Sequence, residues 1–207
     1  MSRITCKSCR RLGESLCGRE KCAYKKRPYA PGILDSQRKH RSSTSEYGEQ
    51  LKAKQKMKIS YGLTENQFSS FVKKIMQTKD SSSEALSPSL KIYNSLESRL
   101  DNMVFRAGFA SGRSLARQIV SHGHITVNGR RLNIPSHKVK IGDVIAIREG
   151  SKALKVFTGL SEKLTNTKSS SNVLAVDPTK LEAKVTGTPR EVEPMFDVQK
   201  VLEFYSR

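Results

Sequence analysis

Four cysteines stand close together near the start of the sequence and form two short pairs. Two residues separate Cys6 from Cys9, four separate Cys17 from Cys22, and seven lie between the pairs. Two such pairs joined by a short loop can bring four thiolates around a tetrahedral Zn²⁺ ion, and basic neighbours help to keep the thiols ionised. The spacing therefore predicts a structural zinc site, because four cysteine ligands leave no open position for catalysis.

Two disulfides, four free thiols and an iron–sulfur cluster are the alternatives for these cysteines. Residues 1–6 contain no apolar run typical of a signal peptide, so we expect a reducing cytoplasm, where disulfides are rare. The expected role of a metal is to fold a terminus that is too small to fold alone.

The charge of the chain favours a polyanionic partner. Its 207 residues include 38 Lys and Arg against 19 Asp and Glu, a formal net charge of +19, and they suffice for one domain with appendages or two small domains. Self-repulsion at this charge destabilises a compact free state, so a bound polyanion should stabilise it. No apolar run approaches the roughly 18 residues of a membrane span. The four histidines (His40, His122, His124 and His137) form no metal or triad spacing, so we expect no enzyme.

Residues 25–58 are densely basic. Residues 46–59 predict a helix whose lysines point in almost every direction, and such a helix is either solvent-exposed or surrounded by another molecule. We interpret that molecule as RNA, on whose bases or sugars tyrosines could stack, although the same rings could pack on protein. The RNA-binding residues predicted here are Lys25, Lys26, Arg27, Tyr29, Arg38, Lys39, Arg41, Tyr47, Lys52, Lys54, Lys56 and Lys58.

Residues 97–149 predict a small module of two short helices and a twisted sheet. Apolar stripes mark helices over 96–107 and 113–121, with Gly108 as a left-handed cap after the first. Asn128 and Gly129 form the strongest short-range hairpin signal, and residues 139–147 alternate as a further strand pair around Gly142 and Asp143.

Basic side chains gather on the flanks of these two helices and on the sheet side. Guanidinium groups pair with phosphates through bidentate forks, which favours nucleic acid, whereas the alternative is an ordinary α/β module with solvated arginines. The predicted RNA-binding residues of the module are Arg99, Arg106, Arg113, Arg117, Ser121, His122, His124, Asn128, Arg130 and Arg131.

Three further features concern the remaining segments. Thr64 and Gln67 form a capping box, with Leu63 and Phe68 as its hydrophobic staple. Residues 77–89 predict a Ser-rich linker, and 152–164 a helix. Residues 173–176 predict a short strand, and we expect the end of the chain to fold back onto the basic N-terminal half.

Several motifs together resemble one family. They are Leu-Glu-Ser-Arg-Leu-Asp-Asn at 96–102, Ala-Arg-Gln-Ile-Val-Ser-His-Gly-His-Ile at 116–125, Val-Asn-Gly-Arg at 127–130, Arg-Pro-Tyr-Ala-Pro-Gly at 27–32 and Glu-Phe-Tyr-Ser-Arg at 203–207. Essentially end to end, the chain resembles the bacterial small-subunit ribosomal protein four family, the founder of the small RNA-binding domain of the same name. The zinc-bearing branch of that family has the same cysteine pairs, which implies that all four cysteines are ligands.

The resemblance implies an α+β fold. A mainly helical basic lobe, built from the N-terminal and C-terminal parts with a zinc-bound N-terminus, would accompany the small two-helix and short-sheet module. The expected divisions are a zinc-binding segment at 1–24, a basic helical rRNA-binding domain at 25–95, the RNA-binding module at 96–150, and a C-terminal tail at 151–207 that packs on the N-terminal lobe.

The resemblance also implies a function. The family members are structural constituents of the small ribosomal subunit in the cytoplasm, bind its ribosomal RNA early, nucleate assembly and affect translational accuracy. Expected partners are this RNA, ribosomal proteins five and twelve and, in some members, their own messenger RNA, with no membrane and no homo-oligomer. An RNA-modifying or RNA-binding accessory factor with the same module is the alternative, but the remaining segments offer no catalytic domain. A zinc-ribbon DNA-binding factor would leave the end-to-end resemblance unexplained.

Overall fold

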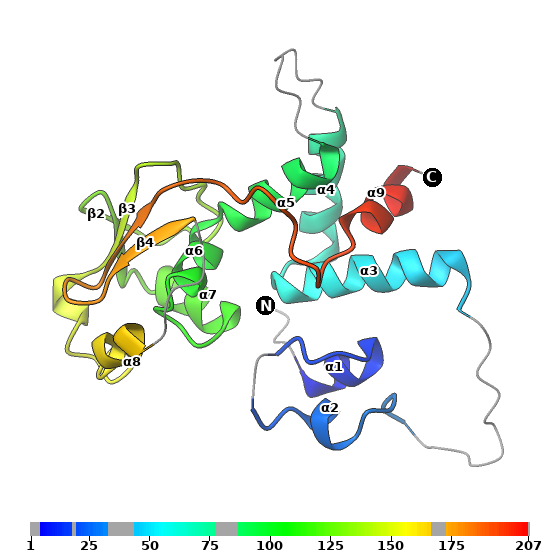
Figure 1. The fold of residues 1–207 in the computed structure, drawn as a ribbon, viewed down its shortest axis with the longest axis horizontal. Helices are drawn as coiled ribbons and strands as arrows, with labels where there is room; N and C mark the ends of the chain where they lie inside the picture. Colours follow the sequence, from blue (N-terminus) through cyan, green and yellow to red (C-terminus); the bar gives the residue numbers. More distant parts are fainter. Residues whose placement is uncertain (1–4, 18–19, 33–43, 78–86, 167–172, 207) are drawn as a thin grey trace. The chain divides into compact units, whose positions relative to one another are not determined.

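The structure is a computed structural model that describes residues 5–17, 20–32, 44–77, 87–166 and 173–206. The chain divides into two compact units: Met1–Ile92 with Val192–Arg207, called here the helical unit, and Tyr93–Glu191, called the mixed unit. Figure 1 shows the elements of each. No helix among the described residues is both long enough and apolar enough to cross a membrane.

The helical unit is held together by a helix from the far end of the chain. Its elements are α1 (Cys6–Leu12), α2 (Ala23–Lys26), α3 (Glu46–Ser60), α4 (Glu65–Gln77), the first half of α5 (Pro88–Glu97) and α9 (Val198–Ser206). The C-terminal helix α9 packs against both α3 and α4 (Figure 1). Aromatic rings form much of this contact, with Phe204 5.7 Å from Tyr47 and Tyr205 6.2 Å from Phe68, centroid to centroid.

The start of α4 confirms the capping box. The Thr64 amide donates to Gln67 Oε1 at 3.2 Å, and the Gln67 amide donates to Thr64 Oγ1 at 3.4 Å. These bonds satisfy two backbone donors that a helix start leaves without an intrahelical acceptor. Leu63 and Phe68, the predicted staple, are both buried.

The mixed unit pairs two helices with an antiparallel sheet, so the α+β class is confirmed. Its elements after α5 are α6 (Leu100–Arg106), α7 (Arg113–Ser121), β1 (Ile125–Val127), β2 (Arg130–Leu132), β3 (Val144–Ile147), the 3₁₀ turn η1 (Glu149–Ser151), α8 (Leu160–Asn166), β4 (Leu174–Asp177) and β5 (Glu182–Val185). The sheet of the described residues has the order β2-β1-β3-β5-β4. Its inner side chains, such as Ile125 and Ile145, join those of α6 and α7 in one core.

The predicted hairpin is confirmed in its turn and its register. Asn128 has φ +51° and Gly129 has φ +78°, the two positive values that a type I′ turn requires. Val127 consequently lies opposite Arg130, and Ile125 lies opposite Leu132.

The second predicted strand pair, over 139–147, is wrong in its first half. Only Val144–Ile147 forms a strand. The preceding segment binds the start of α6 instead, because the Val139 amide donates to the Ser98 carbonyl at 2.8 Å and the Leu100 amide donates to the His137 carbonyl at 2.8 Å. A partner distant in the sequence thus replaces the local one that the alternation predicted.

The mixed unit also extends beyond the module boundary predicted at residue 150. Strands β4 and β5 add to the module's sheet through pairing of β5 with β3, so the unit runs to Glu191. Of the tail predicted at 151–207, only Val192–Arg207 belongs to the helical unit. In place of the helix predicted over 152–164, α8 begins eight residues later and ends two residues later, at Leu160–Asn166. The strand predicted at 173–176 is β4, shifted by one residue.

A close approach between α8 and the turn after α6 gives a test of this packing. Gly108 has φ +79°, and a Cβ added there would lie 2.8 Å from Leu164 Cδ2. Gly108→Ala should therefore destabilise the mixed unit by about 2 kcal/mol, part from the left-handed backbone and part from the clash. Gly159→Ala has a similar φ of +71° but nothing within 4 Å, and should cost about 1 kcal/mol. Equal losses of stability in urea unfolding would contradict the contact with Leu164.

Candidate nucleic-acid interface and metal centre

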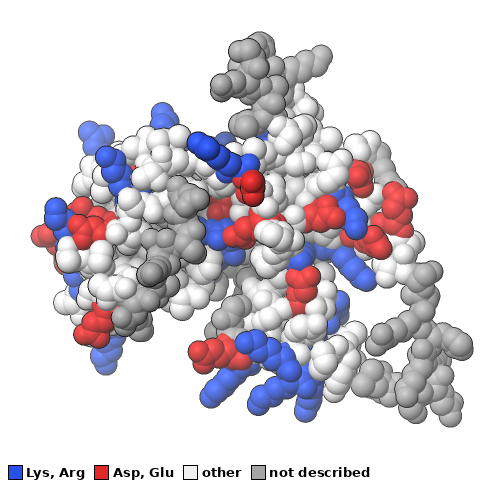
Figure 2. Space-filling view, in the orientation of Figure 1, with Lys and Arg blue, Asp and Glu red and all other residues white. Residues whose placement is uncertain are grey.

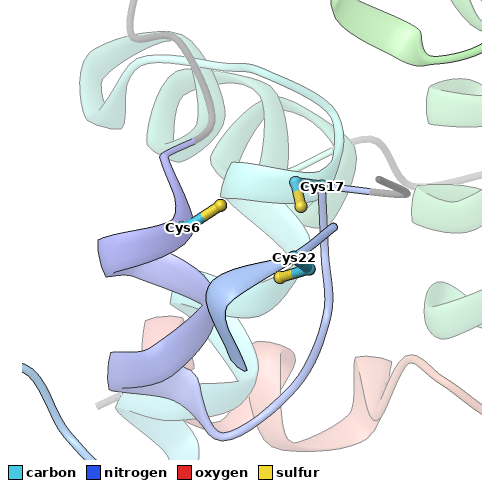
Figure 3. Close-up of side chains that lie close together, drawn as sticks. All are labelled: Cys6, Cys17 and Cys22. Atoms are coloured by element: carbon cyan, nitrogen blue, oxygen red, sulfur yellow. The ribbon is translucent and has the colours of Figure 1, made fainter. Parts of the chain in front are cut away.

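The thiols of the predicted metal site converge. Cys6 begins α1, Cys22 precedes α2, and Cys17 lies in the connection between these helices. The Sγ atoms of these three cysteines lie within 4.8 Å of one another and point toward one another (Figure 3). Tetrahedral Zn–S bonds of about 2.3 Å would set the sulfurs about 3.8 Å apart, so small shifts bring the three sulfurs into coordination.

The fourth cysteine, Cys9, lies one turn after Cys6 in α1 and is fully buried. Burial raises the pKa of its thiol to about 11, and its side chain is hydrogen-bonded with Cys17, although its sulfur is not among the three that lie within 4.8 Å of one another. The pKa of Cys22 is lowered to about 6, chiefly by a hydrogen bond with Ser15 and further by Cys17 and Cys9. All four cysteines are free thiols in the structure, and the donor set suits a thiophilic metal.

Exposed cations surround this cysteine cluster. Figure 2 shows Lys and Arg gathered over α1 and α2. Of the predicted residues, Lys25, Lys26 and Arg27 are exposed here, and Lys7, Arg11 and Lys21 add to them. Such a surface can bind several phosphates of one polyanion.

Arg10 has a role that the sequence did not reveal. Its Nε donates to the Tyr29 carbonyl at 2.9 Å, its Nη2 donates to the Ala30 carbonyl at 3.3 Å, and its guanidinium lies 4.7 Å from the centroid of the Tyr29 ring. Arg10 thereby fixes the extended segment after α2 while the predicted Tyr29 stays 41% exposed. Its position in the last turn of α1, beside the cysteines, is the one signal that could have singled it out.

Some of the predicted RNA-binding residues of α3 are exposed, and others form ion pairs within the protein. Lys52 is exposed, and Tyr47 is 51% exposed although its ring also contacts Phe204. Lys56 pairs with Glu14 and Lys58 pairs with Glu65, each with most of its side chain covered. The predicted residues Arg38, Lys39 and Arg41 lie outside the residues that the structure describes.

The burial of Lys54 contradicts the prediction that RNA surrounds the helix at residues 46–59 on all sides. It is only 6% exposed, its Nζ lies 2.7 Å from Glu65 Oε1, and the same atom lies 4.3 Å from the centroid of the Phe204 ring. This face of α3 packs on α9, so the Lys54 ammonium neutralises a carboxylate within the helical unit. A polar helix face can pack against protein when its buried side chains have hydrogen-bond or ion-pair partners there.

The arginines of the mixed unit are likewise engaged by carboxylates. Glu97 accepts two hydrogen bonds from the Arg106 fork, from Nε at 2.8 Å and from Nη2 at 3.1 Å. Asp101 accepts the Arg99 fork at 3.1 and 2.7 Å, and Arg117 Nη1 lies 3.5 Å away. Only 5% of the Glu97 side chain and 7% of the Asp101 side chain are exposed.

Asn102 extends this cluster. Its Oδ1 accepts from Arg113 Nε at 2.7 Å, and the Arg113 guanidinium lies 4.7 Å from the centroid of the Phe105 ring. The exposed fractions of the four arginine side chains are therefore only 12–23%. That these arginines contact phosphates stays a prediction. Any such contact would use guanidinium groups that already bind protein groups.

The predicted residues on the sheet side have varied partners. Ser121 donates to the Arg117 carbonyl, His124 shares a hydrogen bond with Ser151, and Arg131 donates to the His122 carbonyl. His122 and Arg130 are exposed. Asn128 and Arg130 line a groove beside the β-hairpin.

These observations define a class of protein. Exposed cations cover α1 and α2, a compact two-helix and sheet module carries more of them, and the thiols suit a structural metal. The described residues bring together no set of acid, base and nucleophile of the kind that catalysis needs. The exposed cations of the fold thus fit a polyanion-binding protein.

Comparison with known proteins narrows this class. Residues 2–91 match the family described as "Ribosomal protein S4/S9 N-terminal domain", and residues 98–145 match the "S4 domain". The small ribosomal subunit protein uS4 of Lactiplantibacillus plantarum is 43% identical over 215 residues, with 100% of each chain covered. The uS4 proteins of Limosilactobacillus fermentum and Fervidobacterium nodosum are 44% and 40% identical, with 94% or more of every chain covered. The chain belongs to the ribosomal protein S4 family, as its motifs predicted.

The ion pairs of Glu65 predict how the helical unit responds to acid. Burial of the carboxyl raises its pKa, but hydrogen bonds from Lys54 and Lys58 outweigh burial, so the pKa lies below its ordinary value of 4.5. A lowered carboxyl pKa contributes stability that is present above the unfolded value and is lost as the pH falls through the folded value.

Glu65→Gln should therefore destabilise the protein at pH 6, and the difference from the unsubstituted protein should shrink toward pH 3. Urea unfolding of both proteins at a series of pH values measures this difference. Glu20→Gln is a control, since Glu20 is exposed and should behave as the unsubstituted protein does. A difference that stays constant between pH 6 and pH 3 would argue against the lowered pKa.

Proposed function

We propose that this protein is a structural, non-catalytic constituent of the small ribosomal subunit that binds the ribosomal RNA of that subunit in the cytoplasm. Family membership along the whole chain is the observation that carries the proposal, because the relatives that cover it end to end are named small ribosomal subunit proteins. The surplus of 19 positive charges and the exposed cations over α1 and α2 supply the physical reason.

Finer aspects of the proposal follow from the resemblance in the motifs. The protein binds early to a multi-helix junction of the RNA and helps to nucleate assembly. It lies beside ribosomal proteins five and twelve, contributes to translational accuracy and can bind its own messenger RNA. Phosphate contacts would supply most of the affinity, whereas the shape of a folded junction would supply specificity, since RNA duplexes expose few base edges to side chains.

Filter binding to a junction-containing fragment of small-subunit RNA tests the proposed function. If the protein makes six or more phosphate contacts, raising the salt concentration from 50 to 200 mM should weaken binding by about 1000-fold, because each contact releases condensed counterions. A linear RNA of the same length and base composition is the control and should bind more weakly. Undetectable or salt-insensitive binding to the junction would overturn the proposal.

Sedimentation separates the proposed function from its alternative. A structural constituent should travel with the small ribosomal subunit at high magnesium concentration and stay bound through a salt wash that removes loosely associated factors. The alternative, an RNA-modifying or RNA-binding accessory factor, would leave the mature subunit under the same wash.

We also propose that the four cysteines hold one structural Zn²⁺ ion. Support comes from Cys6, Cys17 and Cys22, whose sulfurs are close together, and from Cys9, which is buried against Cys17. A bound metal would supply folding energy to α1 and α2, two helices of seven and four residues that are too short to be stable in isolation.

Metal analysis tests the zinc proposal. The purified protein should contain about one zinc per chain, and a chelator should remove it with loss of order in residues 5–17 and 20–32, which amide exchange can follow. Cys22→Ser should lose stoichiometric zinc. Ser15→Ala removes the hydrogen bond to Cys22 but no ligand, and should keep the metal. Substoichiometric zinc, with no gain of structure on adding the metal, would refute a structural site.

A further inference from the structure

The mixed unit contains a groove beside its β-hairpin that the sequence did not single out. The groove has a volume of about 490 Å³, and its lining includes Arg130 of β2 together with Lys138 and Lys140 of the segment before β3. Val127 and Leu132 supply apolar surface within it. Three permanent cations thus face one concave surface, against one carboxylate, that of Asp143.

Hydrogen bonds across the groove engage its single carboxylate. Asp143 Oδ2 accepts from the Lys140 amide at 2.8 Å, and Asp143 Oδ1 accepts from Asn128 Nδ2 at 2.8 Å. Asn128 Oδ1 in turn accepts from the Val144 amide at 2.9 Å. Asp143 therefore ties the hairpin turn to the segment before β3, and the groove is formed before any ligand arrives.

The other end of the lysine segment is fixed as well. The backbone of Lys138 forms an antiparallel β-bridge with that of Arg99, and the neighbouring Val139 amide donates to the Ser98 carbonyl at 2.8 Å. Lys138 and Lys140 are two residues apart, about 6.6 Å in extended backbone. Two ammonium groups at this spacing on one wall can each contact a different phosphate of one strand.

The three cations of the groove differ from the arginines of α6 and α7 in one decisive respect. Arg130, Lys138 and Lys140 are all exposed, and within the described part of the chain none of their side-chain nitrogens forms an ion pair with a carboxylate within 4.0 Å, although Lys140 donates its backbone amide to Asp143 and its charge helps to lower the pKa of that carboxyl. By contrast, Arg99 and Arg106 give both arms of their forks to Asp101 and Glu97. A phosphate can thus bind in the groove without breaking an ion pair of the protein.

We propose that this groove is a phosphate-binding site for a strand of ribosomal RNA, in which Arg130, Lys138 and Lys140 each contact a backbone phosphate. This inference rests on the proposed function and deepens it by assigning the surface and the residues. Val127 and Leu132 offer apolar contact to the ribose faces between the phosphates. A sugar-phosphate strand suits the groove because it combines repeating negative charge with an apolar edge.

The salt dependence of RNA binding tests the groove. The triple variant Arg130→Ala, Lys138→Ala, Lys140→Ala should lower the slope of log affinity against log salt by about 2 to 3, close to one for each phosphate that the variant no longer binds. Affinity for the junction-containing fragment should fall at least about tenfold at 100 mM salt. The urea midpoint should stay unchanged, since the bonds that shape this segment come from backbone groups, Asn128 and Asp143.

A matched control separates a local site from net charge. The triple variant Lys155→Ala, Lys180→Ala, Lys184→Ala removes the same charge from exposed positions of the same unit outside the groove. It should change the slope by less than about 1. Equal reductions of the slope in both variants would overturn the proposal, because they would reflect overall charge alone.

Two other results would also overturn the groove and leave the proposed function intact. Full RNA affinity in the folded groove variant would show that no phosphate binds there. Full RNA affinity combined with poor incorporation into the small subunit would assign the groove to an acidic protein segment instead. Failure of the unsubstituted protein to bind the RNA at all would refute the proposed function itself, and is distinguishable from either result.

Discussion

Repulsion among like charges is the constraint on which the rest of this structure depends. With twice as many basic as acidic side chains, the chain cannot give each cation a carboxylate of its own. Instead, single carboxylates pair with two cations each. Glu65 pairs with Lys54 and Lys58. Glu97 lies close to Arg106 and Arg113, and Asp101 close to Arg99 and Arg117.

This sharing determines which cations remain for a partner. A carboxylate that is 93% or more buried, such as Glu97 or Asp101, would be costly without its arginines, and these arginines would repel one another without it. The clusters therefore belong to the packing of each unit. Cations such as Lys25 on α2 and Lys138 in the groove are exposed instead, and under the proposed function they are the ones available to RNA.

The sequence predicted those features whose causes lie within a few residues. The capping box of Thr64 and Gln67 and the type I′ turn of Asn128 and Gly129 depend on local backbone chemistry, and both are present. The convergence of Cys6, Cys17 and Cys22 follows in the same way from the close spacing of the cysteines.

Features that depend on partners distant in the chain could not be predicted from the sequence. Alternation in residues 139–147 gave no sign that Val139 pairs with Ser98, and nothing near residue 150 signalled that β5 pairs with β3. The polar character of Lys54 concealed its contact with Phe204, because the partner lies 150 positions away in the chain. The same limit hid the groove, since its walls come from a hairpin and from a loop that only the fold brings together.

The connectivity of the two units has a consequence for how a newly made chain matures. The mixed unit is one uninterrupted segment, Tyr93–Glu191, so all of its contacts become available as soon as that stretch has left the synthesis machinery. The helical unit has no such freedom, because α9, which follows the mixed unit in the chain, supplies Phe204 and Tyr205 to the contact with α3 and α4. The helical unit can therefore be completed only after the whole of the mixed unit has been made.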